Sequence, residues 1–275
     1  MSRKFKYSDF EKQKNKELNS LFSDWIKQLS KNEKPIDNGD KEKTTPADCF
    51  AKDGFFPGYF GKNNLKVCFI GRETRKIGGY DFRDTTKEFF EDEFNNKNNF
   101  WRHIFYIAYG IKHKGTKSYE EIHNVTAVGI MDEMYNDNNF GFAVINISKY
   151  SNDDKENWQT NVALANRFLS DSNLSETNFF QKELEILNPD IIITANLWEH
   201  GIFNEEYLDL CLPYVNFSKR KNVTHQGKKI AKYGKYNLNG RDIDYIDLYH
   251  FSAKKSDKYC YYNPVMKVLF NKKRK

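Results

Sequence analysis

The stretch LKVCFIGRETR, residues 65–75, decides the fold. Its continuous apolar run, residues 67–70, predicts a short strand that is buried on both faces. The run stops at Gly71, and the charged residues Arg72 and Glu73 follow at once. Because glycine permits a turn and a close approach of the backbone to a ligand, we expect these charges to lie at an open strand end.

Further apolar segments of strand length recur along the chain, and segments with helical spacing separate them. The expected strands are residues 140–148, 190–196 and 243–248, and the expected helices are residues 85–94, 99–111, 156–169 and 177–187. A hairpin is expected to turn at Asn239–Gly240 and to lead into the last strand. Because strands that alternate with helices pair in parallel through crossovers, the sequence predicts an α/β fold with three α/β/α layers and a central, mainly parallel sheet of four strands.

The first 46 residues differ in character from the rest of the chain. Residues 9–30 place apolar side chains three and four positions apart, which predicts an amphipathic helix, and residues 31–46 have the composition of a polar linker. We therefore expect an N-terminal extension over residues 1–46. One α/β domain with a basic C-terminal tail is expected over residues 47–275.

Composition argues against several classes of protein. The apolar runs are far shorter than the roughly 20 residues of a membrane-spanning helix, and the first residues lack the apolar segment of a signal peptide. A cytoplasmic monomer without membrane contact is expected. The four cysteines form no CxxC pair and the six histidines are dispersed, so neither a metal site nor a cofactor is expected. His200 beside Glu199 stays open as a pair of metal ligands.

The positive charge is uneven along the chain. The formal net charge is +6, and residues 218–236 contain many lysines and arginines but no acidic residue. A basic segment interrupted by aromatic residues suits a nucleic-acid backbone, because lysine and arginine displace condensed counterions. The alternative is a solvated basic loop. On the first interpretation the partner is DNA.

Polar side chains follow the carboxyl ends of the predicted strands, where ligands bind in sheets of this kind. Glu73 follows the first strand, Asn146 lies in the second, and His250 and Ser252 follow the last. Each also has a structural interpretation. Glu73 would pair with a neighbouring arginine, Asn146 would satisfy a backbone group, and His250 would be a hydrogen-bonded core residue.

The order of these residues resembles the uracil-DNA glycosylase superfamily. Gly71-Arg72-Glu73 stands where that family has Gly-Gln-Asp, Asn146 matches its base-reading asparagine, and residues 250–252 match its His-Pro-Ser. The resemblance spans residues 65–270. It implies a uracil-DNA glycosylase-like fold and hydrolysis of the N-glycosidic bond of a base in DNA, which leaves an abasic site.

The resemblance also implies roles for single residues. Glu73 would stabilise the positive charge on the sugar and orient water, and His250 would donate a hydrogen bond to the departing base. The expected base-binding residues are Asn146, Arg72, Tyr80 and Phe82. The expected DNA-binding residues are Ser252, Lys219, Arg220, Lys221, Lys254 and Lys255.

The chain departs from the family pattern in the first and last motifs. Arg72 replaces a glutamine, Glu73 replaces a shorter aspartate, and Thr74 and Phe251 stand where proline is common. These changes indicate a divergent member that acts on a modified or damaged pyrimidine rather than plain uracil. A hypermodified cytosine of phage DNA, removed in host defence, is one such substrate.

Two other functions fit parts of the sequence. The carboxylates of residues 189–190 and 242–247 suit a metal-dependent nuclease. The fold would also serve as a non-catalytic DNA-binding module, with the N-terminal helix docking a partner.

Overall fold

The computed structural model describes residues 6–40, 44–95, 97–137, 140–154, 159–173, 176–197 and 215–270, with the side chains of residues 215–220 excepted. None of the helices in these ranges is long and apolar enough to cross a membrane.

Seven strands in the described part of the chain form one mixed sheet, in the order β1-β3-β2-β4-β7-β6-β5. The strands are β1 (Gly54–Phe55), β2 (Val67–Arg75), β3 (Ala143–Asn152), β4 (Ile191–Ala195), β5 (Val215–His225), β6 (Lys228–Leu238) and β7 (Arg241–Leu248). The four neighbouring strands β3, β2, β4 and β7 are parallel, and the strands outside them are antiparallel. The α/β class is therefore confirmed, but the expectation of a four-stranded sheet is wrong.

Of the strands outside these four, β6 is the first arm of the expected hairpin, whereas β1 and β5 were not expected. The basic segment is not a loop, since most of β6 alternates between buried and half-buried residues and pairs with β5. The predicted hairpin between β6 and β7 is confirmed. Asn239 and Gly240 at its turn have φ angles of 52° and 81°, which is the left-handed conformation that two-residue hairpin turns require.

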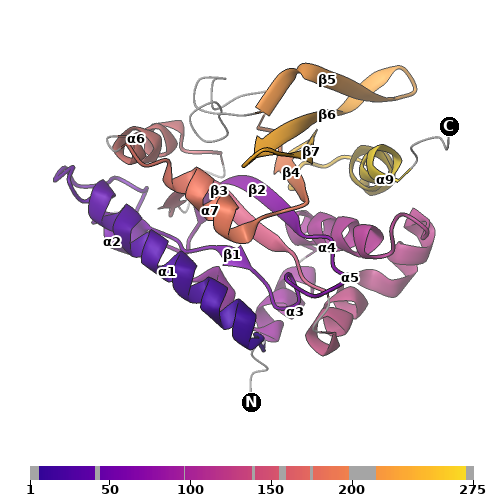
Figure 1. Cartoon of the computed structure of the whole chain (residues 1–275), viewed down its shortest axis with the longest axis horizontal. Coiled ribbons are helices and arrows are strands. Elements are labelled where there is room, and N and C mark those ends of the chain that lie inside the picture. Colours follow the sequence, from indigo (N-terminus) through magenta and orange to yellow (C-terminus); the bar gives the residue numbers. More distant parts are fainter. Residues whose placement is uncertain are drawn as a thin grey trace.

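Helices cover both faces of the sheet (Figure 1). One apolar cluster packs α1 (Asp9–Leu29), α2 (Pro46–Cys49), α6 (Val162–Ser172) and α7 (Phe179–Leu187) against one face. The other cluster packs α3 (Lys87–Asn95), α4 (Asn99–Lys112), α5 (Tyr119–Asn136), the π-helix η2 (Asp257–Tyr262) and α9 (Asn263–Leu269) against the opposite face. The arrangement has three layers, as expected.

Helix α1 is part of this packing and not an extension beside it. Phe22 and Trp25 are buried in the first cluster, where the Trp25 ring stacks on Phe179 with centroids 5.4 Å apart. The Trp25 indole N–H also donates to Ser172 Oγ at 2.9 Å. The amphipathic pattern predicted the helix, but it did not show that the apolar face packs on α6 and α7. Residue 46 therefore does not separate two independently packed parts of the chain.

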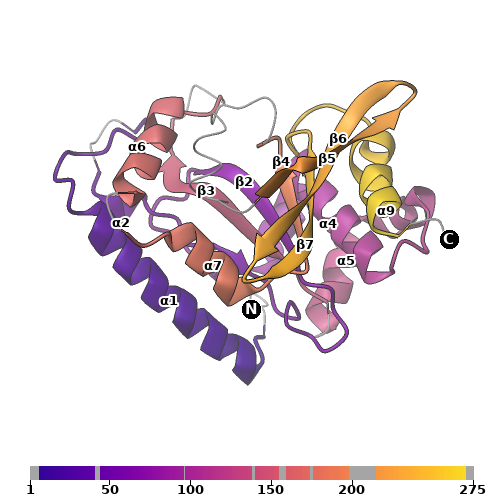
Figure 2. The ribbon, with the colours of Figure 1, turned by 45° about the horizontal axis from the view of Figure 1, so that its top comes forward.

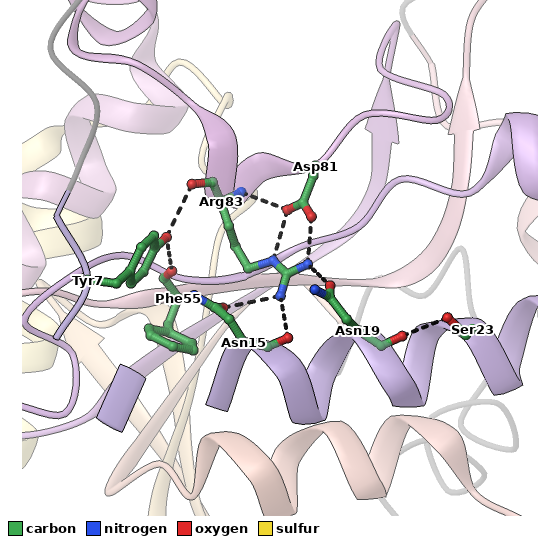
Figure 3. Close-up of polar contacts among 7 residues, drawn as sticks. All are labelled: Tyr7, Asn15, Asn19, Ser23, Phe55, Asp81 and Arg83. Atoms are coloured by element: carbon green, nitrogen blue, oxygen red, sulfur yellow. Dashed lines mark hydrogen bonds and ion pairs between the residues drawn. The ribbon is translucent and has the colours of Figure 1, made fainter. Parts of the chain in front are cut away.

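A buried arginine joins α1 to the segment that follows β2 (Figure 3). Arg83 lies in the short 3-10 helix η1 (Phe82–Asp84) and is 7% exposed. Its guanidinium donates to both carboxylate oxygens of Asp81, to Asn15 Oδ1 at 3.1 Å and to Asn19 Oδ1 at 2.6 Å. Tyr7 Oη donates to the Arg83 carbonyl at 3.2 Å. Since an arginine fork satisfied on all sides is rigid, the segment after β2 is fixed to α1.

Candidate functional site

The predicted catalytic residues lie on or after the parallel strands, but β2 continues to Arg75, so Glu73 lies inside β2 and Asn146 inside β3 and not at strand ends as expected. Gly71 pairs with Asn146, and Glu73 pairs with Ser148, between β2 and β3. Strand β4 lies between β2 and β7, and His250 follows β7 directly. The first two motifs are therefore in register on adjacent strands, and the last motif follows β7, which is separated from β2 by β4.

Asn146 is positioned from two sides. Its side chain is 5% exposed and lies over Gly71, where a Cβ atom would come within 2.4 Å of Asn146 Oδ1. Its backbone N–H donates to Asp53 Oδ2 at 2.7 Å, and Asp53 Oδ1 accepts from Lys149 Nζ at 2.7 Å. Asp53 and Lys149 are completely buried. The absence of a side chain at Gly71 thus makes the room that the Asn146 amide occupies.

Glu73 uses one carboxylate oxygen within the protein. Oε1 accepts from Asn152 Nδ2 at 3.1 Å and from the Asn161 backbone N–H at 3.2 Å. Oε2 is buried, and no donor in the described ranges contacts it. Burial raises the pKa of Glu73, although these hydrogen bonds and the nearby Arg75 and Arg72 oppose the rise. One oxygen is held in place, and the other is buried without a described hydrogen-bond donor.

Arg72 lies between the ends of β2 and β4. Its Nη2 donates to the Asn196 carbonyl at 3.1 Å, and its Nε is buried without an acceptor among the described residues. Burial lowers the pKa of Arg72, while the carboxylates of Asp247 and Glu73 raise it. Arginine stays protonated in proteins, so this guanidinium brings a positive charge and an unused donor to the site.

His250 is a neutral hydrogen-bond donor in this geometry. Burial, and secondarily the charge of Arg72, lower the pKa of His250 to about 4. The Ser252 backbone N–H points at His250 Nδ1 over 3.3 Å. Since Nδ1 accepts that bond, the proton of the neutral ring is on Nε2. The Tyr261 hydroxyl donates to the His250 carbonyl at 2.8 Å and holds the backbone here.

A second histidine, His103 of α4, holds the backbone of the segment that contains His250. Its Nδ1 lies 2.7 Å from the Phe251 carbonyl, and its Nε2 lies 3.0 Å from Asp257 Oδ1. Arg102 Nε donates to the other oxygen of Asp257 at 3.0 Å. Although burial disfavours the Asp257 carboxylate, the hydrogen bonds from His103 and Arg102 lower its pKa to about 2. Sequence reasoning missed this clamp because its partners lie about 150 positions apart.

The aromatic residues lie differently from the expectation. Phe82 packs edge to face on Trp101, with ring centroids 5.8 Å apart, and Tyr80 is 42% exposed. Phe100, at the start of α4, instead lies beside the last motif: its ring centroid is 6.3 Å from that of His250 and 5.6 Å from that of Phe251. Phe100, which the sequence pattern did not indicate, is thus an aromatic side chain that lies beside His250.

The predicted DNA-binding residues are exposed where they are described. Ser252, Lys254 and Lys255 follow His250, and Lys221 lies on β5. The side chains of Lys219 and Arg220 lie outside the described residues.

The carboxylates that suggested a nuclease are engaged elsewhere. Asp190 binds Arg241, Asp244 accepts from Lys235, and Asp247 Oδ1 accepts from the Thr194 hydroxyl at 2.5 Å. The described ranges contain no group of three or more His, Cys, Asp or Glu side chains placed to hold a metal ion. The pair Glu199 and His200 lies outside those ranges.

The chain matches no protein-family model, and neither the curated proteins nor the solved structures give a match. A function can therefore be proposed only from the geometry of Glu73, Asn146 and His250.

Proposed function

We propose that the protein is a monofunctional DNA glycosylase. It flips a modified or damaged pyrimidine out of the DNA stack and hydrolyses the N-glycosidic bond, which leaves an abasic site. The observation that carries the proposal is the buried carboxylate of Glu73, which is held through one oxygen while the other has no described donor, on the strand next to Asn146. The fold supports it through the four neighbouring parallel strands β3, β2, β4 and β7, the last of which leads to His250.

Recognition of the base precedes the chemistry. Extruding a nucleotide costs a few kcal/mol, and the protein must supply contacts that replace the lost stacking. The Phe100 ring beside His250 supplies an apolar face. The Asn146 amide both donates and accepts, which is what the edge of a pyrimidine requires. The position of that amide over Gly71 limits how a base can enter.

Bond cleavage separates charge between the sugar and the base. The bonding electrons leave with the base, and the sugar becomes a cation that the Glu73 carboxylate stabilises. Water adds its oxygen to C1′ while Glu73 accepts the released proton. The Nε2–H of neutral His250 donates to the oxygen of the anionic base, which later takes a proton from solvent. No metal or cofactor takes part.

Arg72 sets the substrate class in this proposal. The family has a neutral glutamine at that position, whereas this chain has a guanidinium with a buried donor that no described residue uses. A substituent that carries hydrogen-bond acceptors would satisfy that donor. We therefore favour a modified pyrimidine, such as a hypermodified phage cytosine, over plain uracil. A cytoplasmic monomer is part of this proposal.

The test is release of the free base. The protein is incubated with DNAs that contain uracil, hydroxymethylcytosine or glucosylated hydroxymethylcytosine, with EDTA or with Mg²⁺, and the released base is measured by mass spectrometry. Release in EDTA with alkali-labile abasic sites is the expected result, and Glu73→Gln should abolish it. Direct strand breaks that need Mg²⁺ would indicate a nuclease instead. The absence of release from every substrate under both conditions would contradict the proposal.

A further inference from the structure

The tip of the β5–β6 hairpin carries a pair of stacked rings. His225, at the end of β5, lies parallel to Tyr259 of η2, with ring centroids 4.4 Å apart and planes inclined by 15°. Tyr259 is 41% exposed, which is unusual for a large aromatic side chain in this protein. The hairpin tip lies next to the C-terminal helices in both views of the molecule (Figure 2). Packing in the core does not explain why this ring pair lies at the surface.

Lysines lie over two of the tyrosine rings in this part of the molecule. Lys258 Nζ lies 5.3 Å from the Tyr259 ring centroid, and Lys255 Nζ lies 5.3 Å from that of Tyr249. The Tyr249 hydroxyl donates to the Lys229 carbonyl at 3.1 Å, which joins the segment after β7 to the hairpin. We call the group of exposed and half-buried residues His225, Lys228, Tyr249, Lys255, Lys258 and Tyr259 the hairpin surface.

Acidic residues on this surface are few and engaged. Residues 221–229 contain no acidic residue, and residues 252–259 contain Asp257 alone. Asp257 binds Arg102 and His103 in the clamp beneath His250. Lys258 also pairs with Glu120 of α5 at 2.5 Å. The excess of lysines therefore favours an anionic partner.

One residue of the hairpin surface, Tyr249, directly precedes His250 in the chain, and its hydroxyl is held by the hairpin. Lysines that follow a phosphate backbone, together with exposed rings on which bases stack, are the combination by which proteins bind single-stranded nucleic acid. In a duplex the faces of the bases are covered by their neighbours, so an exposed ring stack gains little from double-stranded DNA.

We propose that the hairpin surface binds single-stranded DNA beside the target nucleotide, with an unpaired base stacked on the His225–Tyr259 pair. This inference rests on the proposed function and adds the strandedness of the substrate. The lysines of the hairpin surface contact the phosphates, and the ring pair contacts a base without selecting its identity. The target nucleotide then reaches the site already unpaired, so less energy is spent on extruding it.

Binding is measured by fluorescence anisotropy with the full chain carrying Glu73→Gln, so that no base is released. The probes are a labelled single strand, its duplex and an RNA of the same sequence. Tyr259→Ala should weaken single-strand binding about five- to 150-fold, which corresponds to the loss of one stacked base. Tyr259→Phe should bind normally. Lys255→Ala should reduce the salt dependence by about 0.7 in the slope of log K against log salt.

Matched controls separate the hairpin surface from general effects. Phe10→Ala removes an aromatic side chain that is 57% exposed on α1, a helix that packs on the opposite face of the sheet from η2, and should leave binding unchanged. His225→Ala is the second variant and should weaken single-strand binding like Tyr259→Ala. Circular dichroism and thermal melts show whether each variant is folded.

The outcomes distinguish the two proposals. Unchanged single-strand affinity in both Tyr259→Ala and His225→Ala, an equal loss for the duplex, or tighter binding of RNA would overturn the assignment of the hairpin surface. Normal single-strand binding that depends on Tyr259, without base release from any substrate, would overturn the glycosylase function and leave the hairpin surface in place.

Discussion

Replacing Gly71 by alanine tests whether the site depends on the position of Asn146. The new Cβ would lie 2.4 Å from Asn146 Oδ1, about 1 Å closer than an ordinary contact, and the next heavy atoms are 3.5 Å away or more. Gly71 lies within β2, and its φ angle is not in the left-handed region, so alanine adds no backbone strain. The effect is therefore confined to one contact, and the Asn146 amide must move by about 1 Å.

The expected magnitudes follow from that displacement. Overpacking in a buried site costs about 1–3 kcal/mol of folding free energy. A shift of about 1 Å in a substrate-binding group costs on the order of a hundredfold in rate, which is about 2.7 kcal/mol of transition-state stabilisation. Single-turnover base release gives the rate, and urea unfolding gives the stability. Gly129→Ala is the matched control, because its Cβ would meet a side-chain methyl group in α5 at 3.2 Å.

A double-mutant cycle with Asn146→Ala decides the cause. If the new methyl group acts through the amide, Gly71→Ala should cost little activity once Asn146 is alanine. The coupling energy between the two changes should then be about 2.7 kcal/mol, the full effect of Gly71→Ala alone. If Gly71→Ala loses as much activity in the Asn146→Ala background as in the wild type, the reasoning is refuted.

The remaining predictions concern charge and packing. Burial raises the pKa of Glu73, so folding favours the protonated carboxyl relative to the unfolded chain, and stability should fall as the pH rises through that pKa. Glu73→Gln should therefore melt at a higher temperature than wild type at pH 7 while losing activity. Because the pKa of His250 is about 4, its ring should stay neutral with the proton on Nε2 in ¹⁵N NMR spectra at pH 6–8. The lowered pKa of Asp257, about 2, predicts a stabilising contribution that is present at neutral pH and lost as the pH falls from about 4 toward 2; Asp257→Asn should remove that part of the acid dependence in urea titrations and reduce kcat by loosening the His250 segment. Trp25→Ala should cost about 3–5 kcal/mol and keep a single unfolding transition.

Each of these has a clear contrary result. A Glu73→Gln variant less stable than wild type at pH 7, or a His250 ring that titrates near pH 6.5, would contradict the described burial of the site. An unchanged acid dependence in Asp257→Asn would contradict the stabilising role of the hydrogen bonds among His103, Asp257 and Arg102. A second unfolding transition that Trp25→Ala affects alone would make α1 a separate unit.

The sequence predicted features that depend on local patterns. The apolar runs located the four parallel strands, and Asn239–Gly240 located the hairpin, because both signals lie within a few residues. Strand β1 has two residues and no pattern to detect. Strand β5 was not predicted because its lysine-rich sequence resembles that of a solvated loop.

The candidate site was predictable only to the level of strand assignment. The apolar runs placed Glu73, Asn146 and His250 on or after parallel strands, but not how far those strands continue. The contact of Phe100 with His250 and the clamp by His103 required the packing of α4 on the sheet, which no local pattern contains. The hydrogen bonds of Glu73 likewise depend on the distant Asn152 and Asn161.

The position of β5 at the end of the sheet order has a consequence for solubility and for experimental design. An outermost strand presents unpaired backbone groups to other molecules, and lysines on such a strand keep copies of a protein from joining edge to edge. Replacing the lysines of β5 with alanine to test the proposed DNA binding would also remove that protection and favour aggregation. Glutamate substitutions abolish the attraction to phosphate and keep the copies apart, so charge reversal is the safer way to test this strand.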